Sequence, residues 1–214
     1  MGREKKIRVL LVDDHTLVRQ GFRRILEAEP DIEVVGEAPD GRAALEAVRS
    51  LHPAVVVMDV AMPNLNGIEA TRRILAEDPH VRILALSMHK DAVYVREILR
   101  AGASGYLLKD AFDRDLVAAV RAVARGEGYL SPAVSEAVLS DYRRQVKSPL
   151  DLLTSREREV LQLLAEGKTN KEIAALLNLS VYTVDAYRGR IMEKLNLHSL
   201  GELVRFAMRM GLVD

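Results

Sequence analysis

The sequence contains no cysteine, and this absence excludes disulfide bonds and thiolate metal sites. It also has no excess of charge of one sign, because 31 basic residues balance 31 acidic ones, so net charge directs the protein toward no class of partner. No apolar run approaches the roughly 20 residues that a helix needs to cross a bilayer. We therefore expect a cytoplasmic protein in a reducing compartment, with no membrane partner.

The first residues, MGREKKIRVLLVDD, place basic side chains before an apolar stretch, as a secretion signal does. The stretch IRVLLV is too short for such a signal and runs directly into two aspartates. The MG start does not predict N-myristoylation either, because Lys6 stands where that signal requires serine or threonine. We interpret these residues as the first strand of a fold.

Residues 7 to about 125 alternate between short apolar, β-branched runs and amphipathic helical stretches. Strands that alternate with helices predict a parallel sheet, whose right-handed crossovers place helices on both faces. We expect strands at 7–12, 32–38, 54–58, 81–87 and 105–109, and helices that begin near Thr16, Asp40, Gly67, Asp91 and Asp113. The pattern predicts an α/β fold with a flavodoxin-like, doubly wound sheet of five strands.

The alternation stops after Gly126. Residues 127–150 contain a possible short helix and a Ser-Pro pair, and we interpret them as a linker. The chain is then predicted to form two domains, at residues 1–126 and 151–214. No internal repeat or low-complexity segment is present.

The second domain is predicted to be entirely helical. Thr154-Ser-Arg-Glu and Thr169-Asn-Lys-Glu are capping boxes, in which a threonine and the glutamate three residues later satisfy the first backbone groups of a helix. Ser180 and Ser199 are expected to cap two further helices. An apolar stripe on the last helix is interpreted as core, or partly as a dimer face: Leu200, Leu203, Val204, Ala207 and Met208.

Polar side chains follow four of the five predicted strands, and parallel strands deliver such residues to one edge of the sheet, where ligands bind. They are Asp13, Asp14, Asp59, Ser87 and Lys109. Three carboxylates at one edge repel each other unless a cation lies between them, and Mg²⁺ prefers oxygen ligands of this kind. Lys109 could pair with Asp59 or with an incoming phosphoryl group. The set predicts a carboxylate that attacks phosphorus, with charge stabilised by a metal and a lysine.

This edge of the sheet has two other interpretations. Any one of the aspartates could simply cap the next helix, as Asp14 could before HTLVRQGF. An enzyme on the same fold is disfavoured, because a flavin carrier needs a phosphate-binding loop where this chain has Asp13 and Asp14. A small-molecule phosphatase needs a cap and a second acid or base, and neither is evident in the sequence. We therefore expect no enzymatic activity.

Four motifs occur in order over residues 7–125: LLVDDH, VVVMDVAMPNLNGIE, LALSMH and GASGYLLKD. This segment resembles the receiver domain of two-component response regulators. The resemblance implies that Asp59 accepts a phosphoryl group from a histidine kinase. It also implies that Asp14, Asp59 and the backbone carbonyl of Ala61 bind Mg²⁺, while Asp13 acts mainly through water.

The same resemblance implies a conformational switch. Lys109 would hold the phosphoryl oxygens, and Ser87 would bond to one of them after phosphorylation. Tyr106 would then swing inward. A regulator that never takes a phosphate remains the alternative, although the complete set of site residues argues against it. The histidines at positions 15, 52, 80 and 89 are interpreted as ordinary surface residues.

Residues 169–195 follow the helix-turn-helix plan, in which the second helix enters the major groove of DNA. One face of that second helix is expected to pack inward, through Val181, Val184, Ile191 and Leu195. The residues expected to face DNA are Lys171, Tyr182, Thr183, Asp185, Ala186, Tyr187, Gly189 and Arg190. Hydrogen bonds to base edges could come from Tyr182, Tyr187 or Arg190.

Residues 151–214 resemble the LuxR-type (NarL/FixJ) DNA-binding domain in the pieces LTSREREVL, NKEIA, TV and IMEKL. The resemblance implies a transcriptional regulator whose partner is double-stranded promoter DNA. Two departures are Tyr182 and Tyr187, which stand where members of the family often carry Lys and His. Acidic and basic residues also balance in this domain, so non-specific attraction to DNA should be modest. We expect a homodimer, formed on phosphorylation, to supply the remaining affinity.

Overall fold

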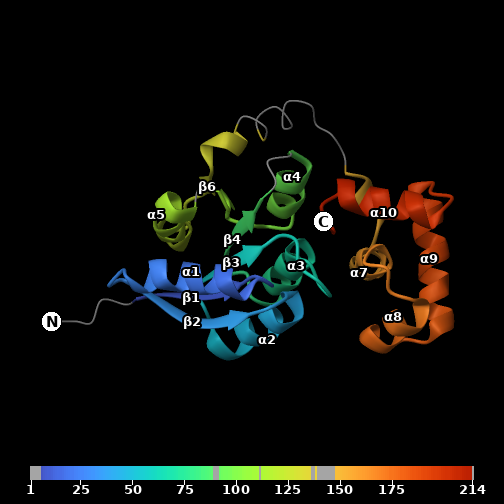
Figure 1. Ribbon diagram of the computed structural model, residues 1–214, viewed down its shortest axis with the longest axis horizontal. Coiled ribbons are helices and arrows are strands. Elements are labelled where there is room, and N and C mark those ends of the chain that lie inside the picture. Colours follow the sequence, from blue (N-terminus) through green and yellow to red (C-terminus); the bar gives the residue numbers. More distant parts are fainter. Residues whose placement is uncertain (1–5, 89–91, 111, 136–137, 139–147, 214) are drawn as a thin grey trace.

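The computed structural model describes residues 6–88, 92–110, 112–135, 138 and 148–213. Figure 1 shows an α/β unit formed by the first part of the chain and a smaller helical unit formed by the last part. The predicted helix start at Asp91 and residues 136–137 and 139–147 of the predicted linker lie outside the described residues. None of the helices in the described ranges combines the length and apolar character needed to cross a membrane.

The first unit is built on a parallel sheet with the strand order β2-β1-β3-β4-β5-β6. The strands are β1 (Ile7–Val12), β2 (Ile32–Ala38), β3 (Val55–Asp59), β4 (Arg82–Ser87), β5 (Gly105–Leu108) and β6 (Tyr129–Leu130). The helices of this unit are α1 (Thr16–Glu27), α2 (Gly41–Leu51), α3 (Gly67–Glu77), α4 (Ala92–Arg100) and α5 (Phe112–Ala124). The predicted doubly wound α/β fold is confirmed.

The sheet contains one strand more than the sequence pattern indicated. Tyr129 and Leu130, which we read as linker, form β6 and pair in parallel with Gly105 and Tyr106 of β5. The amide of Ser131 also donates to the carbonyl of Tyr106 over 2.9 Å. Two residues are too few to show the alternation by which a strand is predicted.

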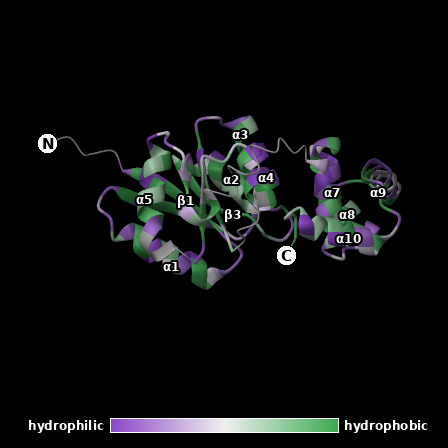
Figure 2. Ribbon diagram, turned by 90° about the horizontal axis from the view of Figure 1, so that it is seen from above, coloured by the Kyte–Doolittle hydropathy of each residue, from purple (hydrophilic) through white to green (hydrophobic). Residues whose placement is uncertain are grey.

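Both faces of the central strands are buried, because side chains alternate between the two faces along a strand. Val9 and Leu11 of β1 pack with Phe22 of α1 on one face. Leu10 and Val12 pack with residues of α2 and α3 on the other. Figure 2 shows this hydrophobic interior between the more hydrophilic outer surfaces of the helices. The core holds the ends of β1 and β3 in fixed positions at the carboxyl edge of the sheet.

The second unit consists of η1 (Pro149–Leu152), α7 (Ser155–Ala165), α8 (Asn170–Leu177), α9 (Val181–Leu195) and α10 (Leu200–Arg209). Both predicted capping boxes form, with Thr154 at the start of α7 and Thr169 at the start of α8. The side chains of Ser180 and Ser199 cap α9 and α10 as expected.

The inward face of α9 differs from the prediction at one residue. Val184 and Ile191 are fully buried, but Val181 lies in the first turn and is 48% exposed. The stripe on α10 is divided, since Leu203 and Ala207 are in the core while Leu200 and Met208 are exposed. In Figures 1 and 2, α7 lies on the side of this unit nearest to the α/β unit and α9 on the side away from it.

Candidate functional site

The carboxyl edge of the sheet brings Asp13, Asp59 and Lys109 together. Asp59 is the last residue of β3, and its side chain is almost completely buried. Lys109 follows β5 directly, and its Nζ lies 2.7 Å from Oδ2 of Asp59 and 2.7 Å from Oδ2 of Asp13. One ammonium group therefore faces two buried carboxylates.

Asp14 completes an acidic cluster with Asp13 and Asp59, and His15 joins it. One ligand atom from each of these four residues lies within 4.8 Å of the others. Carboxylate oxygens in such a group suit a hard cation such as Mg²⁺, and Asp14 is exposed, so the cluster is open to solvent. The residues therefore fit the metal that the sequence implied.

His15 was interpreted as an ordinary surface residue, but it lies beside the acidic cluster. Its Nδ1 is 2.8 Å from Oδ1 of Asp14, and its amide donates to Oδ1 of Asp13. His15 is also the N-cap of α1, and no side chain caps that helix. Asp14 therefore does not act as a helix cap, which was the alternative interpretation of this residue.

Burial raises the pKa of Asp59 from its ordinary value of 3.8 to about 7. The attraction of Lys109 lowers the pKa but does not offset desolvation, and the charges of Asp13 and Asp14 raise it further. For Lys109, burial lowers the pKa, but the attraction of Asp59 and hydrogen bonds to both aspartates outweigh this and leave the pKa above its usual value. Without a metal ion, Asp59 is only partly ionised near neutral pH.

The loop 60–66 connects Asp59 to α3 and has a fixed shape. The amide of Gly67 donates to the carbonyl of Val60 over 2.9 Å, so the loop closes on itself. Oδ1 of Asn66 caps α3 by accepting from the amide of Glu69. A Cβ atom on Gly67 would collide with the carbonyl oxygen of Asp59, and this close approach requires glycine. In this loop, Ala61 lines the same pocket as Asp14 of the acidic cluster.

The two predicted switch residues are both buried. Ser87 ends β4 and is 2% exposed, and its carbonyl accepts from the amide of Lys109. Tyr106 of β5 is fully buried in a cluster with Val60 and Ile68. The ring of Tyr106 thus lies inside in this structure, and the swing that the resemblance implies stays a prediction.

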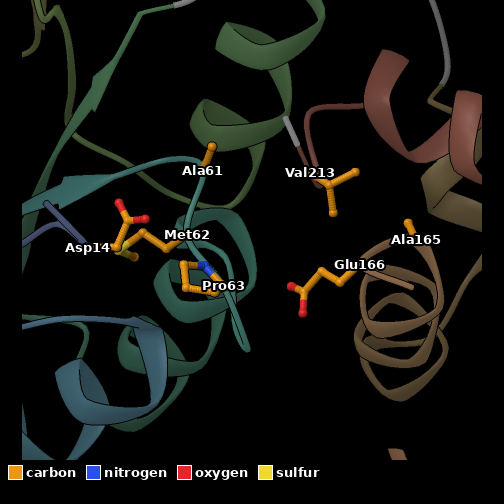
Figure 3. A pocket seen from close by; sticks show the side chains of 7 residues that line it. All are labelled: Asp14, Ala61, Met62, Pro63, Ala165, Glu166 and Val213. Atoms are coloured by element: carbon orange, nitrogen blue, oxygen red, sulfur yellow. The ribbon is translucent and has the colours of Figure 1, made fainter. Parts of the chain in front are cut away.

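A pocket of about 290 Å³ opens beside the acidic cluster, between the two units. In Figure 3, Asp14, Ala61, Met62 and Pro63 line one side of it, and Ala165, Glu166 and Val213 line the other. The carboxylate of Glu166 points toward Pro63. Helix α7 and the C-terminal residues thus form one wall of the space in front of the candidate site.

The residues predicted to face DNA lie on α8 and α9, apart from the acidic cluster. Tyr182 is 86% exposed, and Lys171, Asp185, Ala186, Gly189 and Arg190 are exposed as well. Thr183 and Tyr187 are half-buried. The Arg190 guanidinium lies over the Tyr187 ring, 4.6 Å from its centroid. The outer surface of α9 is accessible in this arrangement of the two units.

The chain matches two family models, one over each of its two structural units. Residues 9–121 match the response regulator receiver domain, and residues 151–207 match the bacterial regulatory proteins of the luxR family. The chain therefore belongs to the response regulators that join a receiver domain to a LuxR-type helix-turn-helix domain.

Known proteins of this family resemble the chain over nearly its whole length. It is 39% identical to the transcriptional regulatory protein DegU of Brevibacillus brevis, covering 98% of this chain and 96% of that protein. It is 41% identical to the response regulator UvrY of Escherichia coli (strain K12), covering 97% and 96%. The solved structure of the RcsB–DNA complex matches with a TM-score of 0.60 and 28% identity, covering 95% of this chain and 98% of that one.

Proposed function

We propose that the chain is a transcriptional regulator that binds DNA when Asp59 is phosphorylated. The observation that carries the proposal is the position of Asp59, a buried carboxylate that meets Lys109 at the carboxyl edge of the sheet. A site of this kind is joined to a helix-turn-helix domain whose second helix is exposed. We further propose the domain limits 1–126 and 151–214, joined by a linker at 127–150 whose residues Tyr129 and Leu130 add the edge strand β6 to the sheet of the first domain.

The phosphoryl group comes from a histidine of a sensor kinase. A carboxylate oxygen of Asp59 forms the new P–O bond while the P–N bond of the phosphohistidine breaks, and the electron pair leaves with the imidazole nitrogen. Lys109 holds the equatorial oxygens and neutralises the charge that develops on them. Because Lys109 already pairs with Asp59 over 2.7 Å, it needs little movement to take this role.

Asp13, Asp14, Asp59 and the carbonyl of Ala61 are the residues that would hold Mg²⁺, with Asp13 acting mainly through water. The bound ion supplies positive charge, which keeps Asp59 ionised and reduces repulsion between the carboxylates and the donor. His15 adds an imidazole beside Asp14 but is not needed for an oxygen-ligated ion. The acidic cluster supports this proposal through its oxygen donors.

The hydroxyl of Ser87 donates a hydrogen bond to the phosphoryl group on Asp59, and Tyr106 responds to this new contact. Phosphorylation favours the inward position of the Tyr106 ring, and the cluster formed by β5 and α4 packs around the ring in that position. This packing promotes a homodimer able to contact two DNA half-sites. RcsB is a relative of this chain, and its solved complex with DNA supports double-stranded DNA as the partner.

The residues proposed to contact DNA are Lys171, Tyr182, Thr183, Asp185, Ala186, Tyr187, Gly189 and Arg190. Lys171 contacts the phosphate backbone. Tyr182 and Arg190 contact base edges, and Ala186 contacts the methyl group of a thymine. The exposure of Tyr182 and Ala186 on one side of α9 supports this assignment.

The intact mass after incubation with acetyl phosphate and Mg²⁺ tests the proposal. Wild type should gain one phosphoryl group, and Asp59→Asn should gain none. A gain in both proteins would place the acceptor elsewhere. No gain in wild type would favour the alternative, a regulator that binds DNA without phosphorylation.

A further inference from the structure

The outer face of α9 carries the carboxylate of Asp185 among uncharged residues. Tyr182, Ala186 and Gly189 are exposed together with it. Residues three, four and seven positions apart lie on one face of a helix, so these four residues share the face proposed to meet DNA. A carboxylate at this place requires a specific reason, because the phosphates of DNA are negatively charged and repel it.

Asn170 holds this carboxylate in place. It is the first residue of α8, and its Nδ2 donates to Oδ1 of Asp185 over 3.2 Å. The bond joins the two helices of the helix-turn-helix and restricts the rotation of the Asp185 side chain. Within the part of the chain that the structure describes, the carboxylate has no other hydrogen-bond partner and no ion pair. Oδ2 therefore keeps its capacity to accept a hydrogen bond from a bound molecule.

Gly189 lies one turn beyond Asp185 and adds no side chain to this face. A Cβ atom at this position would meet no atom within 4 Å, so packing among the described residues does not require glycine. Glycine is also less favourable than alanine inside a helix. Together with the small side chain of Ala186, it lets the backbone of α9 approach the base edges in a major groove closely. At that distance, a side chain as short as that of Asp185 reaches the base edges.

The chemistry of a carboxylate selects one base. A carboxylate only accepts hydrogen bonds, so it is repelled by other acceptors. In the major groove, guanine and thymine present acceptors, and adenine presents an acceptor beside its amino group. Cytosine presents the N4 amino group, which is a donor, and no acceptor. The repulsion between Asp185 and the DNA is therefore offset best where Oδ2 meets a cytosine.

We infer that Asp185 is a specificity-determining residue that accepts a hydrogen bond from N4 of one cytosine in each half-site, and that Asn170 positions its carboxylate. The inference rests on the proposed function and deepens it, because it names a base that the DNA must contain. Contacts to the phosphates carry no sequence information, so this preference comes from the side chains on the outer face of α9.

The test begins with the selection of random duplexes by the full-length wild type, with and without acetyl phosphate and Mg²⁺. Each position of the selected site is then varied through all four base pairs, and the Kd of each duplex is measured by fluorescence anisotropy. The variants are Asp185→Ala, Asp185→Asn and Asn170→Ala, all in the full-length chain. Glu193→Ala is the matched control, since Glu193 is an exposed carboxylate of the same helix, about 12 Å further along its axis.

We expect one position in each half-site at which wild type prefers cytosine over thymine by about tenfold. In Asp185→Ala this preference should fall to less than about twofold at that position only, because alanine accepts no hydrogen bond. In Asp185→Asn the preferred base should change from cytosine to adenine, with which an amide side chain makes two hydrogen bonds. Asn170→Ala should reduce the preference at the same position to about threefold, and Glu193→Ala should leave it at about tenfold.

A purely structural role of Asp185, as a link between α8 and α9, predicts a different result. Asp185→Ala would then weaken binding to all duplexes by the same factor and lower the thermal unfolding temperature, and this outcome would overturn the inference. A preference for cytosine that persists in Asp185→Asn would overturn it too. An equal loss of the preference in Glu193→Ala would show that charge alone matters, which also contradicts the inference.

The selection distinguishes failure of this inference from failure of the proposed function. If wild type enriches no duplex in either condition, the proposed function is rejected. If wild type enriches a site at which no position depends on Asp185, the proposed function stands and Asp185 is not a specificity-determining residue.

Discussion

The Nζ atom of Lys109 lies 2.7 Å from Oδ2 of Asp59, although both side chains are largely withdrawn from water. The same Nζ is equally close to Asp13. A buried charge is tolerated only when it is paired, so this single ammonium keeps two carboxylates stable at the end of the sheet. One positive charge cannot neutralise two carboxylates, so the site keeps negative charge that a further cation can balance.

Replacing Lys109 with methionine tests this relationship. The two carboxylates would then face each other without a cation, and we expect the free energy of unfolding at pH 8 to fall by about 2–4 kcal/mol. The loss should shrink at pH 5, where Asp59 is protonated, and added Mg²⁺ should restore part of it. Urea unfolding with and without Mg²⁺ measures all three effects.

Lys168→Met provides the control for that measurement. Lys168 pairs with Glu166 over 3.3 Å near the surface, so its removal should change stability by less than about 0.5 kcal/mol. A loss in Lys109→Met that stays constant from pH 5 to pH 8 would contradict the role given to the buried carboxylates.

The raised pKa of Asp59 predicts how phosphorylation depends on pH. Only the ionised carboxylate is a nucleophile, so at low Mg²⁺ the rate should fall as the pH drops through about 7. Mg²⁺ favours the ionised form, and saturating Mg²⁺ should therefore shift the midpoint of the profile to lower pH. The initial rate of mass gain from acetyl phosphate between pH 5 and pH 8, at two Mg²⁺ concentrations, measures this shift. A midpoint that does not move with Mg²⁺ would show that Asp59 does not control the profile.

Gly67 makes the sharp return from Asp59 into α3 possible. In Gly67→Ala the new Cβ would meet the carbonyl oxygen of Asp59, and the backbone of β3 cannot move away, so we expect a loss of about 1–3 kcal/mol. Gly21→Ala is the matched control. A Cβ at Gly21, inside α1, meets no atom within 4 Å, and alanine should stabilise that helix by about 0.5–1 kcal/mol. Thermal unfolding of the two variants should move in opposite directions.

The carboxyl edge of the sheet could be predicted from the sequence, because burial on both faces of a strand leaves a continuous apolar run. The helix starts could be predicted as well, because capping leaves a local pattern of polar residues. Asp59 and Lys109 stand where apolar runs end, and parallel strands bring such ends together. The capping boxes at Thr154 and Thr169 were predicted from side chains only three residues apart. In each case the cause acts over a few residues or follows from the topology of the sheet.

Three features could not be predicted because their causes lie in the contact between distant parts of the chain. Gln162 and Glu159 are polar residues of α7 and read as a solvent face, yet the receiver domain buries both. Val181 continues an apolar face but lies in the first turn of α9, beyond the core that α7 and α10 provide. The full burial of the Tyr106 ring is the third feature, because it depends on the packing of α4 on β5.

The exposed face of α9 carries the last prediction. Tyr182 is 86% exposed, so Tyr182→Ala should leave the free energy of unfolding within about 0.5 kcal/mol of wild type. If Tyr182 contacts a base edge, the same variant should bind a selected DNA site about tenfold more weakly, which corresponds to about 1.4 kcal/mol. The site is selected from random duplexes with phosphorylated wild type, and binding is measured by fluorescence anisotropy over a range of salt.

Leu152→Ala, on the exposed surface of η1, is the control, and it should change DNA affinity little. Unchanged affinity in Tyr182→Ala would remove this residue from the DNA-binding surface, whereas an equal loss in both variants would point to an indirect effect. Because the helical domain carries balanced charge, we also expect affinity to fall less steeply with salt than it does for a strongly basic domain.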